Sequence, residues 1–150
     1  MGRKKLRDVG MRRTKKKSLR AIKQSAWRLF SEYVRRRHAD HDGYTRCYTS
    51  GVVAHWTELQ CGHAIGGRNN AVLFDEEICR PQTVAENVFK RGNYPVFTAK
   101  LIREHGLEWF EEKLAGARQA VKLDRETLET IIETYKAKLE ELDSRVLEPA

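Results

Sequence analysis

Positive charge is concentrated at the N-terminal end of this chain. Residues 1–37 contain 15 of the 29 lysines and arginines but only two of the 21 acidic residues, so they carry +13 while the remainder carries −5. A single-sign field of this size at one end of a chain needs an explanation, and binding to an anionic partner is the usual one. Nucleic acid is the commonest partner of such a segment, an anionic membrane surface is the second, and a solvated tail is the third interpretation.

The 150 residues are enough for a single core without stabilising cross-links. Three cysteines, an odd number, argue against a disulfide framework and favour the reducing cytoplasm. The sequence has no apolar run of the ~18 residues that a membrane span needs, and no apolar secretory signal. We therefore expect a cytoplasmic protein that does not enter a membrane. It should consist of a flexible basic arm, residues 1–17, and one domain, residues 18–150.

The pattern of apolar residues predicts a mixed α+β fold. Helical spacing predicts a first helix from a cap at Ser18 to about Arg37, and a last helix after a cap at Asp124. Between them, residues 52–65 are typical of strands, and residues 72–79 are typical of a short strand or of a strand and turn. Pro81 predicts the first turn of a helix beginning near Gln82. Further helices are expected from Pro95 to Gly106 and over residues 107–114. The apolar stripe of the last helix indicates either core or a dimer interface.

The segment from Cys61 to Asn93 holds the residues best suited to catalysis. A neutral imidazole such as that of His63 can take a proton from water. Magnesium prefers oxygen ligands and keeps most of its waters, so the amide oxygen of Asn87 would suffice as an anchor. Together these groups would suit hydrolysis of a phosphodiester. From their spacing alone, a structural histidine and a surface or capping asparagine are the commoner interpretations.

Two stretches of this segment, CGHAIGGRNN and LFDEEICRPQTVAENVFKRGNY, resemble the central motif of the bacteriophage lambda NinG (Rap) recombination endonuclease family. That motif runs roughly C-G-H-F-x-S-R, R-F-D-E-x-N, Q-C-x-x-C-N and G-N. The resemblance continues through SAWRLFSEYVRRR, LIREHGLEWFEEKL and LETIIETYKAKLEEL, and so covers roughly residues 18–142. It implies a small ββα-metal core (His-Me finger, HNH-like), about residues 45–93, flanked by an N-terminal helix and by C-terminal helices over residues 95–143.

The resemblance also implies a function: a metal-dependent endonuclease that cuts branched DNA, such as Holliday junctions or D-loops, in phage recombination. By matching positions, His63 would be the general base, Arg68 would contact the phosphate, and Asn87 would bind Mg²⁺ or Mn²⁺. Cutting two strands of a junction needs two active sites, which favours a homodimer. The residues expected to contact DNA are Arg12, Arg13, Lys15, Lys16, Lys17, Arg20, Lys23, Arg35, Arg36, Arg37, Lys90 and Arg91.

The chain departs from the family pattern at several positions. The family's two Cys-x-x-Cys knuckles, which bind a structural zinc, fall on Cys47 and Ser50 and on Thr83 and Glu86. Cys47 is a remnant, zinc is not expected, and Glu86 is expected to be solvated.

Gly62 stands where many HNH proteins carry a metal-binding aspartate. Ile78 stands where the family has an asparagine that steadies the loop holding the histidine. These departures leave two alternatives open. One is a catalytically inactive DNA-binding protein on the same scaffold. The other is a helical RNA-binding protein, which predicts that the centre of the chain has no strands.

Overall fold

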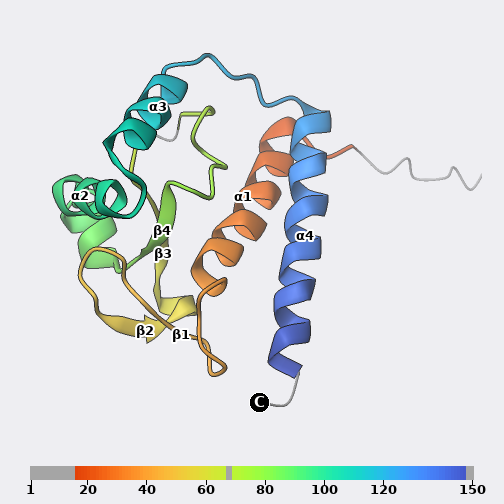
Figure 1. Cartoon of the computed structure of the whole chain (residues 1–150). Coiled ribbons are helices and arrows are strands. Elements are labelled where there is room, and N and C mark those ends of the chain that lie inside the picture. The colour runs from red at the N-terminus through yellow and green to blue at the C-terminus, as the bar shows by residue number, and fades with distance from the viewer. Residues whose placement is uncertain (1–15, 67–68, 148–150) are drawn as a thin grey trace, which may run out of the picture.

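The computed structural model of this chain describes residues 16–66 and 69–147. These residues form α-helices and two small antiparallel sheets (Figure 1). The elements are α1 (Leu19–Arg36), β1 (Tyr44–Arg46), β2 (Val53–His55), the short 3₁₀ turn η1 (Trp56–Glu58), β3 (Gln60–His63), β4 (Cys79–Gln82), the π-helical turn η2 (Ala85–Phe89), α2 (Tyr94–His105), α3 (Leu107–Ala117) and α4 (Arg125–Leu147). The α+β prediction is confirmed, and the central strands contradict the helical RNA-binding alternative.

Most of the predicted arm lies outside the described residues, and only Lys16 and Lys17 of it are included. Within the described part of the chain, no helix combines the length and the apolar character that crossing a membrane would require.

Both long helices begin at the predicted caps. The Ser18 hydroxyl accepts a hydrogen bond from the Ala21 amide at 3.2 Å, and the Asp124 carboxylate accepts one from the Thr127 amide at 2.8 Å. Each cap satisfies an amide that has no partner within its own helix. The sequence signals that predicted where these helices begin are therefore confirmed.

Helices α1 and α4 lie side by side and run in the same direction (Figure 1). Near their N-terminal ends, Arg125 donates to the Lys17 carbonyl at 2.9 Å. Near their C-terminal ends, Arg36 pairs with Asp143 at 2.6 Å. The apolar stripe of α4 is used within the chain, where its buried members are Leu128, Tyr135 and Leu139.

The β3–β4 hairpin packs against the other side of α1, and α2 and α3 lie beyond it (Figure 1). In the hairpin, Gln60 pairs with Gln82 and His63 pairs with Cys79. The core is continuous through these layers. Its largest fully buried side chains include Phe30 and Val34 of α1, Ile78 beside the hairpin, and Phe97 and Leu101 of α2.

One predicted element differs from the structure. Pro81 does not open a helix: it lies within β4, opposite Cys61, and η2 begins only at Ala85. The pairing partner of Pro81 comes from a distant part of the chain, so the local sequence signal is overridden. Residues 72–77 form turns and β4 begins at Cys79, which agrees with the strand-and-turn form of the prediction for residues 72–79.

Gly62 allows a close approach between the two strands of the hairpin. A Cβ at this position would lie 1.9 Å from the Gln82 side-chain oxygen. The Gln82 side chain is fully buried, and its nitrogen donates to the Thr49 hydroxyl at 3.0 Å and to the Gly92 carbonyl at 2.9 Å. The amide therefore cannot move aside without losing both hydrogen bonds.

We predict that Gly62→Ala lowers the free energy of unfolding by about 1–3 kcal/mol through overpacking. The matched control is Gly116→Ala in α3, where a Cβ meets no atom within 4 Å. That substitution should raise the free energy of unfolding by about 0.5–1 kcal/mol, because alanine favours the helix. Urea titrations followed by circular dichroism measure both values, and equal effects of the two substitutions would contradict the packing argument.

Candidate functional site

His63 is the last residue of β3 and is oriented by two other parts of the chain. Its Nε2 lies 3.1 Å from the Leu73 carbonyl oxygen. A carbonyl only accepts hydrogen bonds, so Nε2 carries the proton and Nδ1 is the basic nitrogen of the neutral ring. The Trp27 ring of α1 stacks on the imidazole, with the ring centroids 5.4 Å apart and the planes 18° apart. Both the tautomer and the orientation of His63 are therefore set by its surroundings.

A basic hollow lies next to this histidine. It has a volume of about 290 Å³ and is lined by Arg20, Lys23, Gln24, Trp27 and Leu73. Leu73 and Trp27 thus form its wall and also contact His63. Lys23 donates to the Asn70 side chain at 3.0 Å, and Arg20 is exposed. Two cations and an adjacent imidazole are the groups that a phosphate site needs.

The loop over residues 69–78 carries the Leu73 carbonyl and is held at its start by the end of α3. The Asn69 side chain donates to the Ala117 carbonyl at 2.5 Å, and that of Asn70 donates to the Val121 carbonyl at 3.2 Å. Phe74 packs inward, with its ring perpendicular to that of Phe30 and the two centroids 5.5 Å apart.

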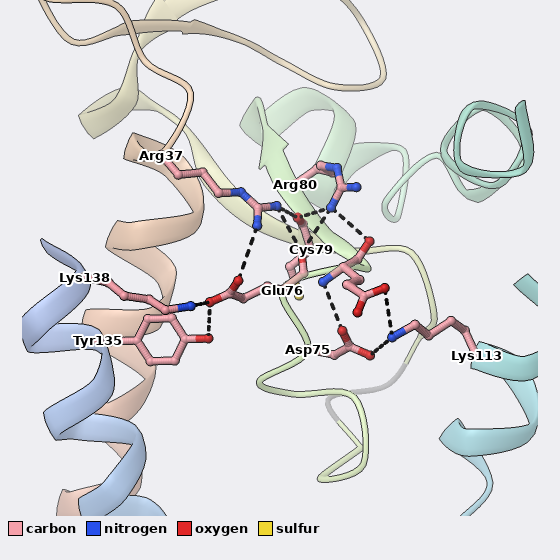
Figure 2. A network of polar contacts seen from close by, with 9 residues as sticks. Arg37, Asp75, Glu76, Cys79, Arg80, Lys113, Tyr135 and Lys138 are labelled. Carbon is pink, nitrogen blue, oxygen red and sulfur yellow. Dashed lines mark hydrogen bonds and ion pairs between the residues drawn. The ribbon is translucent and has the colours of Figure 1, made fainter. Parts of the chain in front are cut away.

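Three consecutive acidic residues tie the same loop to the surrounding helices (Figure 2). Asp75 pairs with Lys113 of α3 at 2.9 Å. Glu76 accepts hydrogen bonds from Tyr135, at 2.6 Å, and from Lys138, both on α4. Glu77 follows and accepts a hydrogen bond from the Trp109 indole of α3 at 3.2 Å. We call Asp75, Glu76 and Glu77 the acidic clamp.

Two arginines complete this arrangement by binding backbone carbonyls (Figure 2). Arg37 donates to the carbonyls of Glu76 and Cys79 at 3.0 and 2.9 Å, and Arg80 donates to the same two carbonyls at 3.1 and 2.9 Å. Between them, Ile78 is fully buried in the core. At the position of the family's loop-steadying asparagine, the loop is therefore held by apolar packing and by these guanidinium groups.

The acidic clamp affects the protonation of Glu76. Burial alone would raise the pKa of this carboxyl group. Hydrogen bonds from Lys138 and Tyr135, together with the nearby charges, outweigh burial and hold the pKa below its ordinary value. Glu76 is therefore a carboxylate at neutral pH.

The predicted DNA contacts fall into two groups. Lys16, Lys17 and Arg20 are exposed at the start of α1, and Lys90 and Arg91 are exposed after η2. Arg35, Arg36 and Arg37, at the end of α1, are instead used inside the fold. Arg35 donates to the carbonyls of Ser31 and Trp56, Arg36 pairs with Asp143, and Arg37 binds the loop as described above. Arg12, Arg13, Lys15 and Arg68 lie outside the described residues.

Asn87 lies on η2 and contacts the hairpin at the strand end away from His63. Its side-chain nitrogen donates to the Gln60 side-chain oxygen at 2.9 Å. Side chains alternate along a strand, so Gln60 and Gly62 point to one face of the hairpin while Cys61 and His63 point to the other. The structure therefore brings His63 together with α1, but it does not bring His63 and Asn87 together.

The four positions to which the resemblance assigns the zinc-binding knuckles meet in space. The Cys47 sulfur lies 3.3 Å from the Thr83 amide and is hydrogen-bonded to Ser50, while the Glu86 amide donates to the Thr83 hydroxyl at 3.3 Å. Burial would raise the pKa of the Cys47 thiol, but hydrogen bonds from Ser50 and from backbone amides lower it to about 7. In the described part of the chain, no three His, Cys, Asp or Glu side chains form a group that could hold a metal ion.

Glu86 is not solvated, which corrects the expectation from the sequence. It is only 3% exposed, and its carboxylate accepts hydrogen bonds from Lys90 at 2.9 Å and from Asn93 at 2.7 Å. These two hydrogen bonds, with a contribution from Thr49, lower the pKa of Glu86. The carboxylate is thus part of the turn that follows η2.

We predict that Glu76→Gln lowers the free energy of unfolding at pH 7 by about 1–3 kcal/mol, because it breaks a partly buried network of charged hydrogen bonds. Since the folded-state pKa of Glu76 is depressed, its contribution is present above the ordinary pKa of 4.5 and is lost as the pH falls through the folded-state pKa. The variant should therefore lose less stability than the wild type on acidification. Denaturant titrations between pH 7 and pH 3 measure this difference.

The control for this experiment is Glu77→Gln, whose side chain is 58% exposed, so its effect should stay below about 1 kcal/mol. Equal destabilisation by both substitutions, or an unchanged acid dependence in Glu76→Gln, would contradict the role assigned to Glu76.

Comparison with known proteins gives one match. The profile of the family described as Bacteriophage Lambda NinG protein matches residues 2–145. No curated protein and no solved structure matches the chain. Because the family match covers nearly the whole sequence, the chain belongs to the bacteriophage lambda NinG family.

Proposed function

We propose that this protein is a metal-dependent endonuclease of phage recombination that cuts branched DNA, such as Holliday junctions or D-loops. In this proposal β3, β4 and η2 form a His-Me finger (HNH-like, ββα-metal) core. The observation that carries it is the setting of His63, whose tautomer is fixed by the Leu73 carbonyl beside the basic hollow of α1. An imidazole held in this way is suited to general-base catalysis at a phosphate.

The reaction would be hydrolysis of a phosphodiester. Nδ1 of His63 takes a proton from water, the water oxygen bonds to phosphorus, and the bond from phosphorus to the leaving oxygen breaks. The leaving oxygen then takes up a proton from solvent water, and the imidazolium of His63 returns its proton to solvent. Arg20 and Lys23 bind the phosphate beside His63 and reduce the cost of its negative charge. Arg68, five residues after His63 in the sequence, would stabilise the additional charge of the transition state. The exposed cations at the start of α1 supply binding that does not depend on base sequence.

Asn87 is the residue proposed to hold Mg²⁺ or Mn²⁺. Its side-chain nitrogen is used by Gln60, so its oxygen is the atom that can ligate. One amide oxygen fits a cation that is otherwise held by water and by the oxygens of DNA. When bound there, the metal would supply charge neutralisation at a DNA phosphate on the Asn87 face of the hairpin. Symmetric cutting of a junction would be the work of a homodimer.

The second candidate function is a catalytically inactive DNA-binding protein on the same scaffold. The observation that favours it is the placement of His63 and Asn87 on opposite faces of the hairpin. Both candidates require the basic surface at the start of α1, and only the endonuclease requires His63.

We predict that the wild-type protein cuts a labelled four-way junction with Mg²⁺ or Mn²⁺ but not with EDTA. His63→Ala should reduce the rate by roughly 10²–10⁴-fold, the usual contribution of a general base. Asn87→Ala should raise the metal concentration that cleavage requires. The control is His55→Ala, which removes a partly exposed histidine of β2 and should leave the rate unchanged. Cleavage that survives His63→Ala would come from a contaminant and would favour the inactive scaffold.

A second prediction concerns binding in EDTA. If six to ten phosphates are contacted, affinity should fall by roughly 10³–10⁵-fold between 50 and 200 mM salt. Replacing Arg20 and Lys23 together by alanine should make the slope of log K against log salt shallower by about 2, or about 1 for each lost contact. The control is Lys136→Ala, which removes an exposed cation of α4. An unchanged slope in the double variant would place the phosphate contacts elsewhere.

A further inference from the structure

Phe89 is the most exposed of the large apolar side chains in the described part of the chain, at 81%. It ends η2, and the preceding Val88 is 52% exposed. A buried aromatic ring makes one of the larger contributions to the stability of a core. The exposed ring of Phe89 makes no such contribution. An exposed apolar group next to charged residues is typical of an interaction surface.

The backbone that presents Phe89 is held from the inside. Arg91 and Asn93 both adopt left-handed conformations, with φ of 50° and 46°, which non-glycine residues rarely do. The buried Glu86 carboxylate binds both ends of this turn, at Lys90 and Asn93, and the Gly92 amide donates to the Glu86 carbonyl at 2.9 Å. Short π-helical segments such as η2, and backbone strain, both recur at functional sites.

This turn lies against the loop that leaves His63. Tyr94, directly after the turn, fills the space beside two glycines. A Cβ on Gly92 would lie 3.2 Å from the Tyr94 ring, and a Cβ on Gly66 would lie 3.1 Å from the Tyr94 hydroxyl. Gly66 is only three residues after His63, so the turn and the candidate catalytic segment share one region of the molecule.

The positive charge of the residues that follow Phe89 indicates which kind of partner this surface would bind. Glu86 is the sole acidic residue between residues 83 and 95, and it is buried. Lys90, whose side chain is 62% exposed, and the exposed Arg91 follow the ring directly. An aromatic face bordered by cations is complementary to single-stranded nucleic acid, because every base offers a face for stacking and each nucleotide carries a phosphate.

We infer that Phe89 stacks on an unpaired base of the DNA and gives the protein its preference for branched over fully paired substrates. The inference rests on the proposed action on DNA, and it adds that the protein recognises unpaired bases in that DNA. In an intact duplex both faces of each base are covered by its neighbours. At a fork or a branch point, bases become available to the ring while Arg91 contacts an adjoining phosphate.

The test is a binding measurement in EDTA, where no metal-dependent cutting occurs. Fluorescence anisotropy compares a forked DNA carrying unpaired bases with a fully paired duplex of equal length at one salt concentration. Phe89→Ala should reduce the preference for the fork by roughly 5- to 150-fold, which corresponds to about 1–3 kcal/mol for one stacked base. Phe89→Trp should retain the preference. Because the ring is exposed, neither substitution should change the unfolding midpoint.

The matched control is Val53→Ala, which removes a side chain that is 51% exposed on β2 and should leave the preference unchanged. An unchanged preference in Phe89→Ala would overturn the inference, as would a wild type that binds fork and duplex equally. Sedimentation that shows a wild-type dimer and a Phe89→Ala monomer would also overturn it, by assigning the ring to self-association. Fork preference that depends on Phe89, without metal-dependent cutting, would support the inference and contradict only the endonuclease.

Discussion

The hydrogen-bonded acidic clamp is the interaction on which the rest of the candidate site depends. Asp75 and Glu77 tie the loop to α3, and Glu76 ties it to α4 (Figure 2). The loop in turn carries the carbonyl that orients His63. Hydrogen bonds in such a network strengthen one another, so loss of the Glu76 contacts weakens the hold of the others on the loop. Helices distant in sequence from His63 thereby fix the position of its imidazole.

A second polar centre joins β1 to the segment after β4. It occupies the four positions at which the family resemblance implies zinc-binding knuckles, and Cys47 and Glu86 provide its ionisable groups. Hydrogen bonds there connect the same two chain segments that a metal would connect. Its carboxylate extends the connection to the turn after Phe89. One centre thus orients the histidine, and the other orients the exposed aromatic ring.

Short sequence patterns correctly predicted those parts of the fold that depend on interactions between neighbouring residues. Ser18 and Asp124 cap helices through neighbouring amides, and both predictions are confirmed. Pro81 was wrongly assigned to a helix because its pairing with Cys61 depends on tertiary structure. For the same reason the burial of Glu86 and the internal use of Arg37 could not be predicted from neighbouring residues. No feature of the sequence pointed to the Leu73 carbonyl as the partner of His63, because every residue has a backbone carbonyl. The resemblance singled out His63, but the structure supplied the contacts that orient it.

The most direct test of this account is a long-range ¹H–¹⁵N NMR spectrum of the histidine rings at a pH where they are neutral. The chain has five histidines, and comparison with His63→Gln assigns the ring of interest. The account predicts a single tautomer for His63, with the proton on Nε2 and none on Nδ1. In Glu76→Gln, where the loop is less firmly held, the two tautomers should mix. A proton on Nδ1 in the wild type, or a wild-type average of both forms, would contradict the assignment of Nδ1 as the catalytic base.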